Sequence, residues 1–493
     1  MNQSKLLKIN PHESENPLDL SLKESFSLCQ SQLRPPFPLK IPSPTEYSHL
    51  NLALIYGTLT EPNLAKTHIT HLHAIVVDGY KLFTTTLINL TNQNYHKLPE
   101  TPRAQLIWVT SQLVQVSAVK VDSLLISLLR QISGGDFSEP NLWLCVKLLE
   151  IFDQNWDRLL DEQPLVLKSA VFVFLRLLSD HYRLVGIGNL DDLKRLEADF
   201  CVKALRQRFA LCMKIGRDLV RLLQDLVFIP EFREIWKDLL FDPSKFQVPG
   251  FTDISQLYCV RTSSQYFLLR ISPEMETHLR FLLTHVKWGN QKRYQAWFAK
   301  KHLSLPGSET VIIDIVRFIC CAHHPSNEII HSDVISRWAV IGWLLTCCRK
   351  NYFLANVKLA LFYDWLFFDE KVDNIMNIEP AMLLMVNSLP QYVDITHTLL
   401  EFLFLLVDNY DVHRKEMIAR GASTSFGILV RKGVIRSLEP LISCSLLSPL
   451  LRERLSTFVS TSNLGVVMKG SSDFCSRQLE RTRVAECHVE VSK

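Results

Sequence analysis

The stretch SPEMETHLRFLLTHV, residues 272–286, decides the fold class. Ser272 is a favoured N-cap residue and Pro273 suits the first helical position, so a helix is predicted to begin here. The apolar side chains that follow recur at i, i+4, i+7, i+8 and i+11, which is one stripe of an α-helix. They are Met275, Leu279, Leu282, Leu283 and Val286.

The same spacing recurs at residues 215–226, where Ile215, Leu219, Leu222, Leu223 and Leu226 share a face. We expect the charged residues of this second stretch to lie on its outside. They are Lys214, Arg217, Arg221 and Asp225.

Short interruptions separate helical stretches of this kind along residues 47–456, and alternating strand-like runs flanked by hairpin turns are missing. Breaks that recur every 20 to 45 residues or so suit stacked helix pairs. The sequence therefore predicts an all-α fold, an irregular α-solenoid of the HEAT or armadillo kind without a legible consensus repeat. The predicted breaks are 61–63, 99–102, 134–140, 186–192, 243–250, 272–273, 306–307 and 369–374.

The two ends differ from this pattern. Seven of the 22 prolines precede residue 45, so residues 1–46 are predicted to form an extended, mobile, Pro-rich arm without a helix. A docking peptide is the less favoured alternative for this arm. Residues 457–493 are small and polar and are predicted to be a poorly ordered tail. The predicted organisation is an arm, a helical scaffold over 47–456 and a tail.

Charge and cysteine content restrict the class of protein. Lys and Arg number 54 against 50 Asp and Glu, and the net charge of +4 is too small to indicate nucleic-acid binding by itself. Twelve cysteines in 493 residues are too few for a disulfide scaffold, which favours reduced thiols in an intracellular protein. We find no secretory signal and no apolar run of the roughly 18 residues that a membrane span needs.

Catalytic and metal-binding signatures are weak. The chain has no phosphate-binding Gly-Lys-Ser/Thr loop and no HExxH pair, and no cofactor is predicted. Cys320, Cys321, His323 and His324 crowd four ligand types together, but neighbours on one helical turn point in different directions. We therefore interpret them as buried thiols followed by a histidine pair at a helix end, and an enzyme with an unfamiliar site is the least favoured reading.

A basic and aromatic segment at residues 287–301, KWGNQKRYQAWFAKK, is the strongest chemical signal. Cationic side chains can neutralise phosphates, and exposed aromatic rings can stack on unpaired bases. The competing and favoured interpretation is a solvated helix whose Tyr294, Trp297 and Phe298 turn inward. The candidate nucleic-acid contacts are Lys287, Lys292, Arg293, Lys300 and Lys301.

Seven longer strings carry a resemblance to a known family. They are IGRDLVRLLQ (215–224), IPEF (229–232), QKRYQAWF (291–298), HPSNE (324–328), RWAVIGWLLT (337–346), LALFYDWLFF (359–368) and IMNIEPA (375–381). In this order and spacing, over about residues 47–456, the chain resembles the N-terminal half of the Integrator complex subunit 3 family, whose members also belong to the sensor-of-single-stranded-DNA (SOSS) complex. Shorter matches, RAQLIWV (103–109), GGD (134–136) and LRLLSDH (175–181), extend the resemblance upstream.

This resemblance implies a non-enzymatic helical scaffold in the nucleus, with the cytoplasm left open. It implies other Integrator subunits as partners, in 3′-end processing of small nuclear RNA and control of transcription. It also implies binding of an OB-fold single-stranded-DNA-binding protein and a small third SOSS subunit, in DNA repair and the DNA damage response. The OB fold would hold the nucleic acid, so contact with this chain would be mainly indirect.

Partner contacts are expected on loops and exposed helix ridges, and the candidates taken from the shorter matches are Arg103, Gly134 and Asp136. The arm before residue 47 matches no part of the family, and the family's long C-terminal half does not follow residue 456. Self-association and subunit docking through that half are therefore in doubt for this chain, and truncation or alternative splicing would account for its absence.

Overall fold

The computed structural model describes residues 5–8, 14–37, 42–184 and 190–464. Within these residues the regular structure is helical and no β-strand forms, although one isolated antiparallel bridge joins Lys287 and Val334. The all-α prediction is therefore confirmed. Among the described residues, no helix is both long enough and apolar enough to cross a membrane.

The chain divides into two compact units. Unit 1 comprises residues 1–133, 137–201 and 272–276, and unit 2 comprises residues 134–136, 202–271 and 277–493. Two helices, α10 (Leu190–Gln207) and α16 (Pro273–His285), contribute residues to both units.

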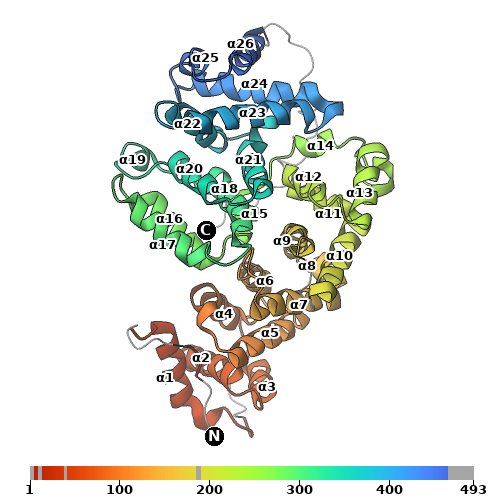
Figure 1. Ribbon diagram of the computed structural model, residues 1–493. Helices are drawn as coiled ribbons and strands as arrows, with labels where there is room; N and C mark the ends of the chain where they lie inside the picture. The colour runs from red at the N-terminus through yellow and green to blue at the C-terminus, as the bar shows by residue number, and fades with distance from the viewer. Residues whose placement is uncertain (1–4, 9–13, 38–41, 185–189, 465–493) are drawn as a thin grey trace. The chain divides into compact units, whose positions relative to one another are not determined.

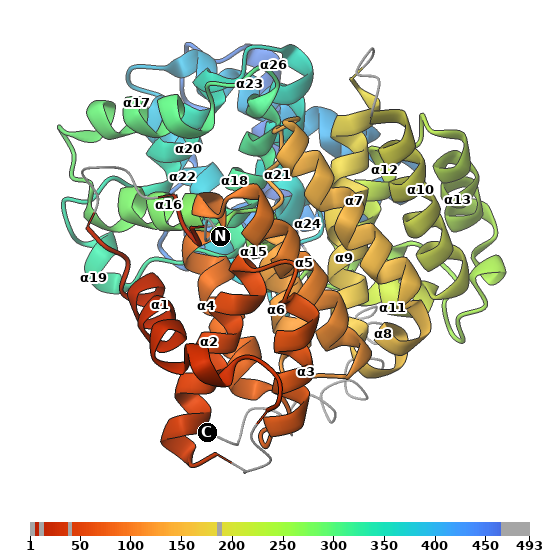
Figure 2. The same ribbon diagram turned by 90° about the horizontal axis from the view of Figure 1, so that it is seen from below.

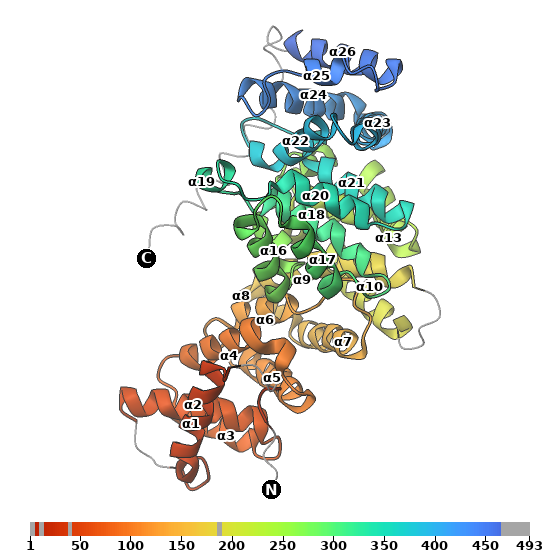
Figure 3. The same ribbon diagram turned by 60° about the vertical axis from the view of Figure 1, so that its left-hand side comes forward.

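Unit 1 is a stack of helices in which neighbours along the chain pack against one another. Figure 2 shows α2, α4, α5 and α6 side by side, and Figure 3 shows α1 and α3 against α2. The helices are α1 (Pro17–Cys29), α2 (Pro44–Thr60), α3 (Ala65–Ile75), α4 (Lys81–Asn94), α5 (Glu100–Gln115), α6 (Val121–Leu129), α7 (Glu139–Gln154), α8 (Trp156–Glu162) and α9 (Pro164–Tyr182).

Unit 2 is also built from packed helices, but the helices of residues 202–271 are shorter and less regular. Its helices after α10 are α11 (Phe209–Cys212), α12 (Arg217–Gln224), α13 (Pro230–Phe241), α14 (Ser255–Tyr258), α15 (Ser264–Leu269), α17 (Gln291–His302), α18 (Val311–Cys321), α19 (Asn327–Ile330), α20 (Arg337–Cys347), α21 (Asn351–Leu366), α22 (Glu379–Ser388), α23 (Val393–Asn409), α24 (Lys415–Arg431), α25 (Glu439–Ile442) and α26 (Pro449–Leu464). Figure 1 shows α22, α23, α24 and α26 stacked in succession, which is the predicted arrangement of helix pairs.

The helix predicted from residues 272–286 is confirmed. The backbone N–H of Met275 donates to the Ser272 hydroxyl over 3.3 Å, which is the expected N-cap bond, and α16 begins at Pro273. All five apolar residues of the predicted stripe are buried, each less than 10% exposed. The helix boundary and its buried face could both be read from the sequence.

The Pro-rich arm contains a helix, which corrects the prediction that residues 1–46 hold none. Helix α1 begins at Pro17, and the side chain of Asn16 accepts hydrogen bonds from two backbone N–H groups of the first turn. Leu22 and Phe26 are buried, and the Phe26 ring lies 5.0 Å from the ring of Tyr56 in α2. The prolines crowd into residues 35–44, so residues 18–34 are free of them and can continue the helix.

The other end also differs from its predicted boundary. Helix α26 continues to Leu464, so the predicted tail begins inside a helix and not at residue 457. The rest of the predicted tail lies outside the described residues.

Candidate functional site

Helix α12 carries buried charges, which corrects the expectation that Arg217 and Arg221 lie outside. Arg217 is 1% exposed and Arg221 is 8% exposed, whereas Lys214 is exposed. Helical spacing identifies which residues share a face, but the second face of α12 is covered too. The stretch is also shorter than predicted, because Gly216 separates α12 from a 3₁₀ turn at Met213–Ile215.

The covered face of α12 meets α18 and α21 through a network of ion pairs. Two arginines face three carboxylates from distant parts of unit 2: Arg217 Nη2 lies 2.9 Å from Asp373 Oδ1, and Arg317 Nη2 lies 2.8 Å from Asp218 Oδ2. The carboxylate of Asp364 joins both halves, at 3.4 Å from Arg217 Nη1 and 3.1 Å from Arg317 Nη1. We call these residues, together with Arg221, the buried ion network.

The network balances three guanidiniums against three carboxylates, since Arg221 Nε also lies 2.9 Å from Asp218 Oδ1. Burial alone would raise the pKa of Asp364, but the Arg317 and Arg217 guanidiniums hold it below its ordinary value. The Cys321 thiol donates to Asp364 over 3.1 Å, and the Tyr363 hydroxyl donates to the Arg217 carbonyl over 2.7 Å. Each charged group of the network has a counterion, although Arg217 Nε and Arg317 Nε donate to no acceptor among the described residues, and such buried pairs favour a structural role.

A second cluster surrounds Arg337, the first residue of α20. Its Nη1 donates to the carbonyls of Ile319 and His323 at 3.0 and 3.1 Å, at the C-terminal end of α18. Its Nη2 donates to the Met376 carbonyl over 3.0 Å and pairs with the Glu379 carboxylate. Carbonyls at a helix end have no partner inside the helix, so Arg337 satisfies groups that would otherwise be buried without one.

These two clusters join most of the strings that carried the resemblance. Arg217, Arg337, Asp364 and Glu379 come from four different strings, which are separated by up to 162 positions in the chain. The strings are recognisable in the sequence, but their spacing does not show that they supply paired charges inside one unit. The signal was an arginine or aspartate inside an otherwise apolar helix, where a partner is required.

The four residues predicted as thiols and a histidine pair have structural surroundings. Cys320 and Cys321 are buried in the last turn of α18, and burial raises the pKa of Cys320 to about 12. His324 Nε2 lies 3.1 Å from Asn377 Oδ1, while His323 is buried beside Phe318. Within the described residues, no three side chains are grouped so that they could hold a metal ion.

The basic and aromatic segment forms α17 and the turn before it. Lys292, Arg293 and Lys300 are exposed on α17, and Lys301 is exposed next to Lys300. Residues 292, 296 and 300 are four apart, so both lysines lie on one helix ridge. Lys287 is exposed in the turn and its Nζ lies 2.9 Å from Asp333 Oδ2.

The aromatic residues of α17 behave differently from one another. Phe298 is fully buried and Tyr294 is half-buried, as the solvated-helix interpretation requires. Trp297, however, is 40% exposed and stands beside His278, so the expectation that it turns inward is wrong. Trp288 is 45% exposed. Two tryptophans therefore lie near the cationic residues with part of each ring accessible.

The three predicted partner contacts do not share one environment. Arg103 lies in α5 of unit 1, where its Nη2 donates to the Leu98 carbonyl over 3.0 Å. Gly134 and Asp136 belong to unit 2. Gly134 is buried, and a Cβ atom there would come within 2.8 Å of Arg270 Nη2, so this glycine permits close packing against Arg270. Partner contact by Arg103, Gly134 and Asp136 stays a prediction.

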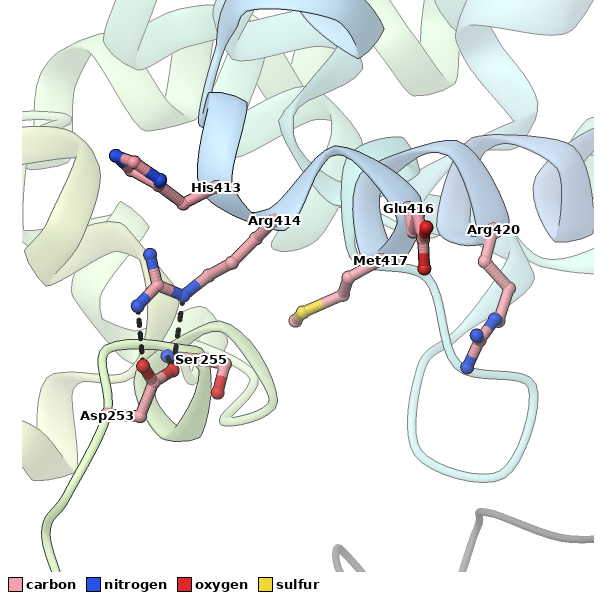
Figure 4. A pocket seen from close by; sticks show the side chains of 7 residues that line it. All are labelled: Asp253, Ser255, His413, Arg414, Glu416, Met417 and Arg420. Carbon is pink, nitrogen blue, oxygen red and sulfur yellow. Dashed lines mark hydrogen bonds and ion pairs between the residues drawn. The ribbon is translucent and has the colours of Figure 1, made fainter.

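A shallow hollow of about 430 Å³ lies between residues 253–255 and the start of α24 (Figure 4). Arg414 forms a bidentate ion pair with Asp253 there, with Nη2 at 2.5 Å from Asp253 Oδ2 and Nε at 3.1 Å from Asp253 Oδ1. Glu416 and Arg420 reach toward it from α24. Two cations and two carboxylates line this hollow, so it offers no strong preference for a charged ligand.

Comparison with known proteins gives one consistent result. The family model described as Integrator complex subunit 3 N-terminal matches residues 45–457. Integrator complex subunit 3 of Mus musculus is 39% identical over 430 residues, which are 86% of this chain and 41% of the mouse protein. The homolog of that subunit from Dictyostelium discoideum is 40% identical over 83% of this chain and 27% of its own length. The chain thus spans less than half the length of these relatives.

Among solved structures, the NOT1 superfamily homology domain from Chaetomium thermophilum aligns with 92% of this chain and all of its own. The sequence identity is 13% and the TM-score is 0.28, which is too low to support an argument.

Proposed function

Because this chain belongs to the Integrator complex subunit 3 N-terminal family, we propose that it is a non-enzymatic scaffold subunit of an Integrator assembly. The observation that carries the proposal is the family match, which spans residues 45–457. The interior of unit 2 supports it, because the buried ion network and the Arg337 cluster engage charged groups in pairs that hold helices together. Such groups are not poised for chemistry on a substrate.

The proposal extends to partners and compartment. We infer that the protein acts in the nucleus together with other Integrator subunits, in the 3′-end processing of small nuclear RNA. We also infer binding of an OB-fold single-stranded-DNA-binding protein and a small third subunit in the DNA damage response. A net charge of only +4 supports the inference that the OB-fold partner contacts the nucleic acid, because a chain that does not itself bind phosphates needs little excess positive charge.

Co-purification tests this function. The full chain, immobilised through a terminal tag, is expected to retain the family's OB-fold protein from solution and to gain affinity for single-stranded DNA when that partner is present. A bacterial OB-fold single-strand-binding protein serves as the specificity control. Failure to retain the cognate OB-fold protein, with other Integrator subunits also absent from pull-downs out of nuclear extract, would overturn the proposal.

A second candidate function is direct binding of single-stranded nucleic acid through residues 287–301. The exposed ridge of Lys292 and Lys300 and the accessible ring of Trp297 favour it. The isolated chain would then bind an oligothymidine, and Lys292→Ala with Arg293→Ala would weaken binding and reduce the salt slope by about 1.4.

The matched control removes two positive charges elsewhere in unit 2, through Lys432→Ala with Arg436→Ala, both of which are exposed. Equal weakening by the two double variants would show general charge attraction and would eliminate this candidate.

A further inference from the structure

A hollow of about 440 Å³ lies where the C-terminal end of α10, helix α11 and a 3₁₀ turn at Pro243–Phe246 meet. All of its lining residues fall within residues 202–271 of unit 2. It is lined by residues 206–211 and 246–248 and by Lys214. None of the residues used by the candidate functions above belongs to it.

The lining carries positive charge from three side chains, Arg206, Arg208 and Lys214, and none of the described residues that line the hollow is acidic. The sequence explains this imbalance, because four basic residues and no acidic residue lie between Asp199 and Arg217. This hollow therefore differs from the one in Figure 4, where Asp253 and Glu416 accompany Arg414 and Arg420.

One of the three cations is held in place and two remain available. Arg206 Nη1 lies 2.6 Å from Asp238 Oδ2, and the same carboxylate is shared with Lys245 Nζ at 2.7 Å. The Arg206 guanidinium also lies 5.9 Å from the ring centre of Phe246, within the range of a cation–π contact. Arg208 and Lys214 are exposed, and Arg208 Nη1 donates to the neighbouring Gln207 carbonyl over 3.2 Å.

The aromatic residues of the lining distinguish a nucleic acid from an anionic peptide as the ligand. Phe209 and Phe246 stack with ring centres 4.0 Å apart and are 1% and 5% exposed. These rings hold the turn against α11, but they present no free face on which a nucleobase could stack. The site offers cationic hydrogen-bond donors without base platforms, and arginine clusters of this kind recognise phosphorylated or acidic peptide motifs.

We propose that this hollow, which we call the α11 basic hollow, binds an anionic segment of a protein partner, with a phosphoserine, phosphothreonine or glutamate side chain received by Arg208 and Lys214. Arg206 lines the same site but is oriented by Asp238. This inference stands apart from the proposed scaffold function, because it needs neither an OB-fold partner nor another subunit.

Fluorescence anisotropy on the full chain tests the proposal with three labelled probes of equal length. They are a peptide with one phosphoserine flanked by glutamates, its unphosphorylated counterpart and an oligothymidine. The phosphopeptide is expected to bind, and Arg208→Ala with Lys214→Ala is expected to weaken binding at least tenfold, since each charged hydrogen bond lost accounts for about tenfold. If the unphosphorylated peptide binds equally and is lost in the same variant, the proposal is supported with carboxylate as the recognised group.

Lys432→Ala with Arg436→Ala is the charge-matched control, and Arg420→Ala tests the hollow of Figure 4. Both are expected to change phosphopeptide binding less than twofold. The proposal is overturned if these controls weaken binding as much as the test variant, or if neither peptide binds. It is also overturned if the oligothymidine binds through Arg208 and Lys214 more tightly than either peptide. Thermal melting of the test variant should match the wild type, because both residues are exposed.

Discussion

Asp364 is the residue on which the buried ion network depends most. It pairs with Arg317 and Arg217 and accepts from the Cys321 thiol. Asp364→Asn removes the charge but keeps the shape, so two buried guanidiniums lose their shared counterion. We expect a loss of about 3–5 kcal/mol in the free energy of unfolding, measured by chemical denaturation.

Glu370→Gln is the control for that variant, since Glu370 forms an ion pair with Arg431 in which both side chains are about half exposed. Its loss is expected to stay below about 1 kcal/mol. Equal losses for the two variants would contradict the role given to the network.

Gly216 occupies a position that excludes other residues for two reasons. Its φ is +89°, and a Cβ atom there would lie 2.7 Å from the Val260 carbonyl oxygen. Gly433 shares the positive φ, at +74°, but a Cβ atom there would meet nothing within 4 Å. Replacing either glycine by Ala is expected to cost about 1–3 kcal/mol for the backbone.

Gly216→Ala should cost more than Gly433→Ala, because the close approach to Val260 adds to the backbone term. The difference between the two melting temperatures measures this addition. A Gly216→Ala variant that melts at or above the melting temperature of Gly433→Ala would show that the backbone at Val260 moves without cost, and would contradict the predicted difference.

Helix α1 is held to α2 by its buried residues, and neighbouring positions provide a matched test. Phe26 is 4% exposed against Tyr56, whereas Leu28 is 72% exposed on the same helix. Phe26→Ala is expected to cost about 3–5 kcal/mol locally, and Leu28→Ala about 0.5 kcal/mol or less. Amide hydrogen exchange of residues 17–29 measures this, and equal protection in the two variants would contradict the packing described.

The link between residues 253–255 and α24 is sensitive to acid. Burial would raise the pKa of Asp253, but Arg414 and the Ser255 backbone N–H hold the pKa at about 2, below its ordinary value of 3.8. Since the unfolded chain then takes up the proton first, this stabilisation is complete above about pH 4 to 5 and disappears as the pH falls toward 2. The unfolding free energy of the wild type should fall more steeply between pH 4 and 2 than that of Asp253→Asn.

At the scale of elements, the sequence predicted what depends on local pattern. The N-cap, start and buried stripe of α16 follow from spacing alone, and the structure confirms them. Helix α1 was missed because the density of prolines was averaged over residues 1–46, although residues 18–34 contain none. The charged face of α12 was wrongly placed outside, because its cover comes from α18 and α21, about 100 to 150 positions away.

The candidate sites were less predictable than the helices. Exposure of Lys292, Arg293 and Lys300 agrees with a charged helix face, but Trp297 is more exposed than helical spacing suggested. The α11 basic hollow joins residues 206–214 to residues 246–248, and its shape depends on tertiary packing that no local pattern encodes. The four basic residues between Asp199 and Arg217 are evident in the sequence, but their spacing does not show that they line a hollow together with residues 246–248.

For the whole molecule, thiol reactivity reports whether the described interior is intact. Ten of the twelve cysteines lie in the described residues and are thiols outside any disulfide, and six of them are buried. Burial raises the pKa of Cys212 to about 12, whereas Cys444 is half-buried. Iodoacetamide should alkylate Cys212 more than about 100-fold more slowly than Cys444, because the thiolate forms only after local unfolding.

Peptide mass spectrometry after timed alkylation measures both rates in one sample, and a denatured sample supplies the control in which the two cysteines react alike. Similar native rates at the two positions would contradict the burial of Cys212.

The buried ion network also limits how this protein can change in evolution or by design. Helical repeats are commonly treated as modules that can be excised, duplicated or exchanged, because each interacts mainly with its neighbours. Here Arg217 and Arg317 share the carboxylate of Asp364, which lies 147 positions after Arg217. Removing the helix that carries one of these three residues would leave a buried charge on another helix without its counterion. The helices between Arg217 and Asp373 are therefore expected to tolerate deletion or exchange only together, whereas α23, α24 and α26 lie outside the network and are not restricted by it.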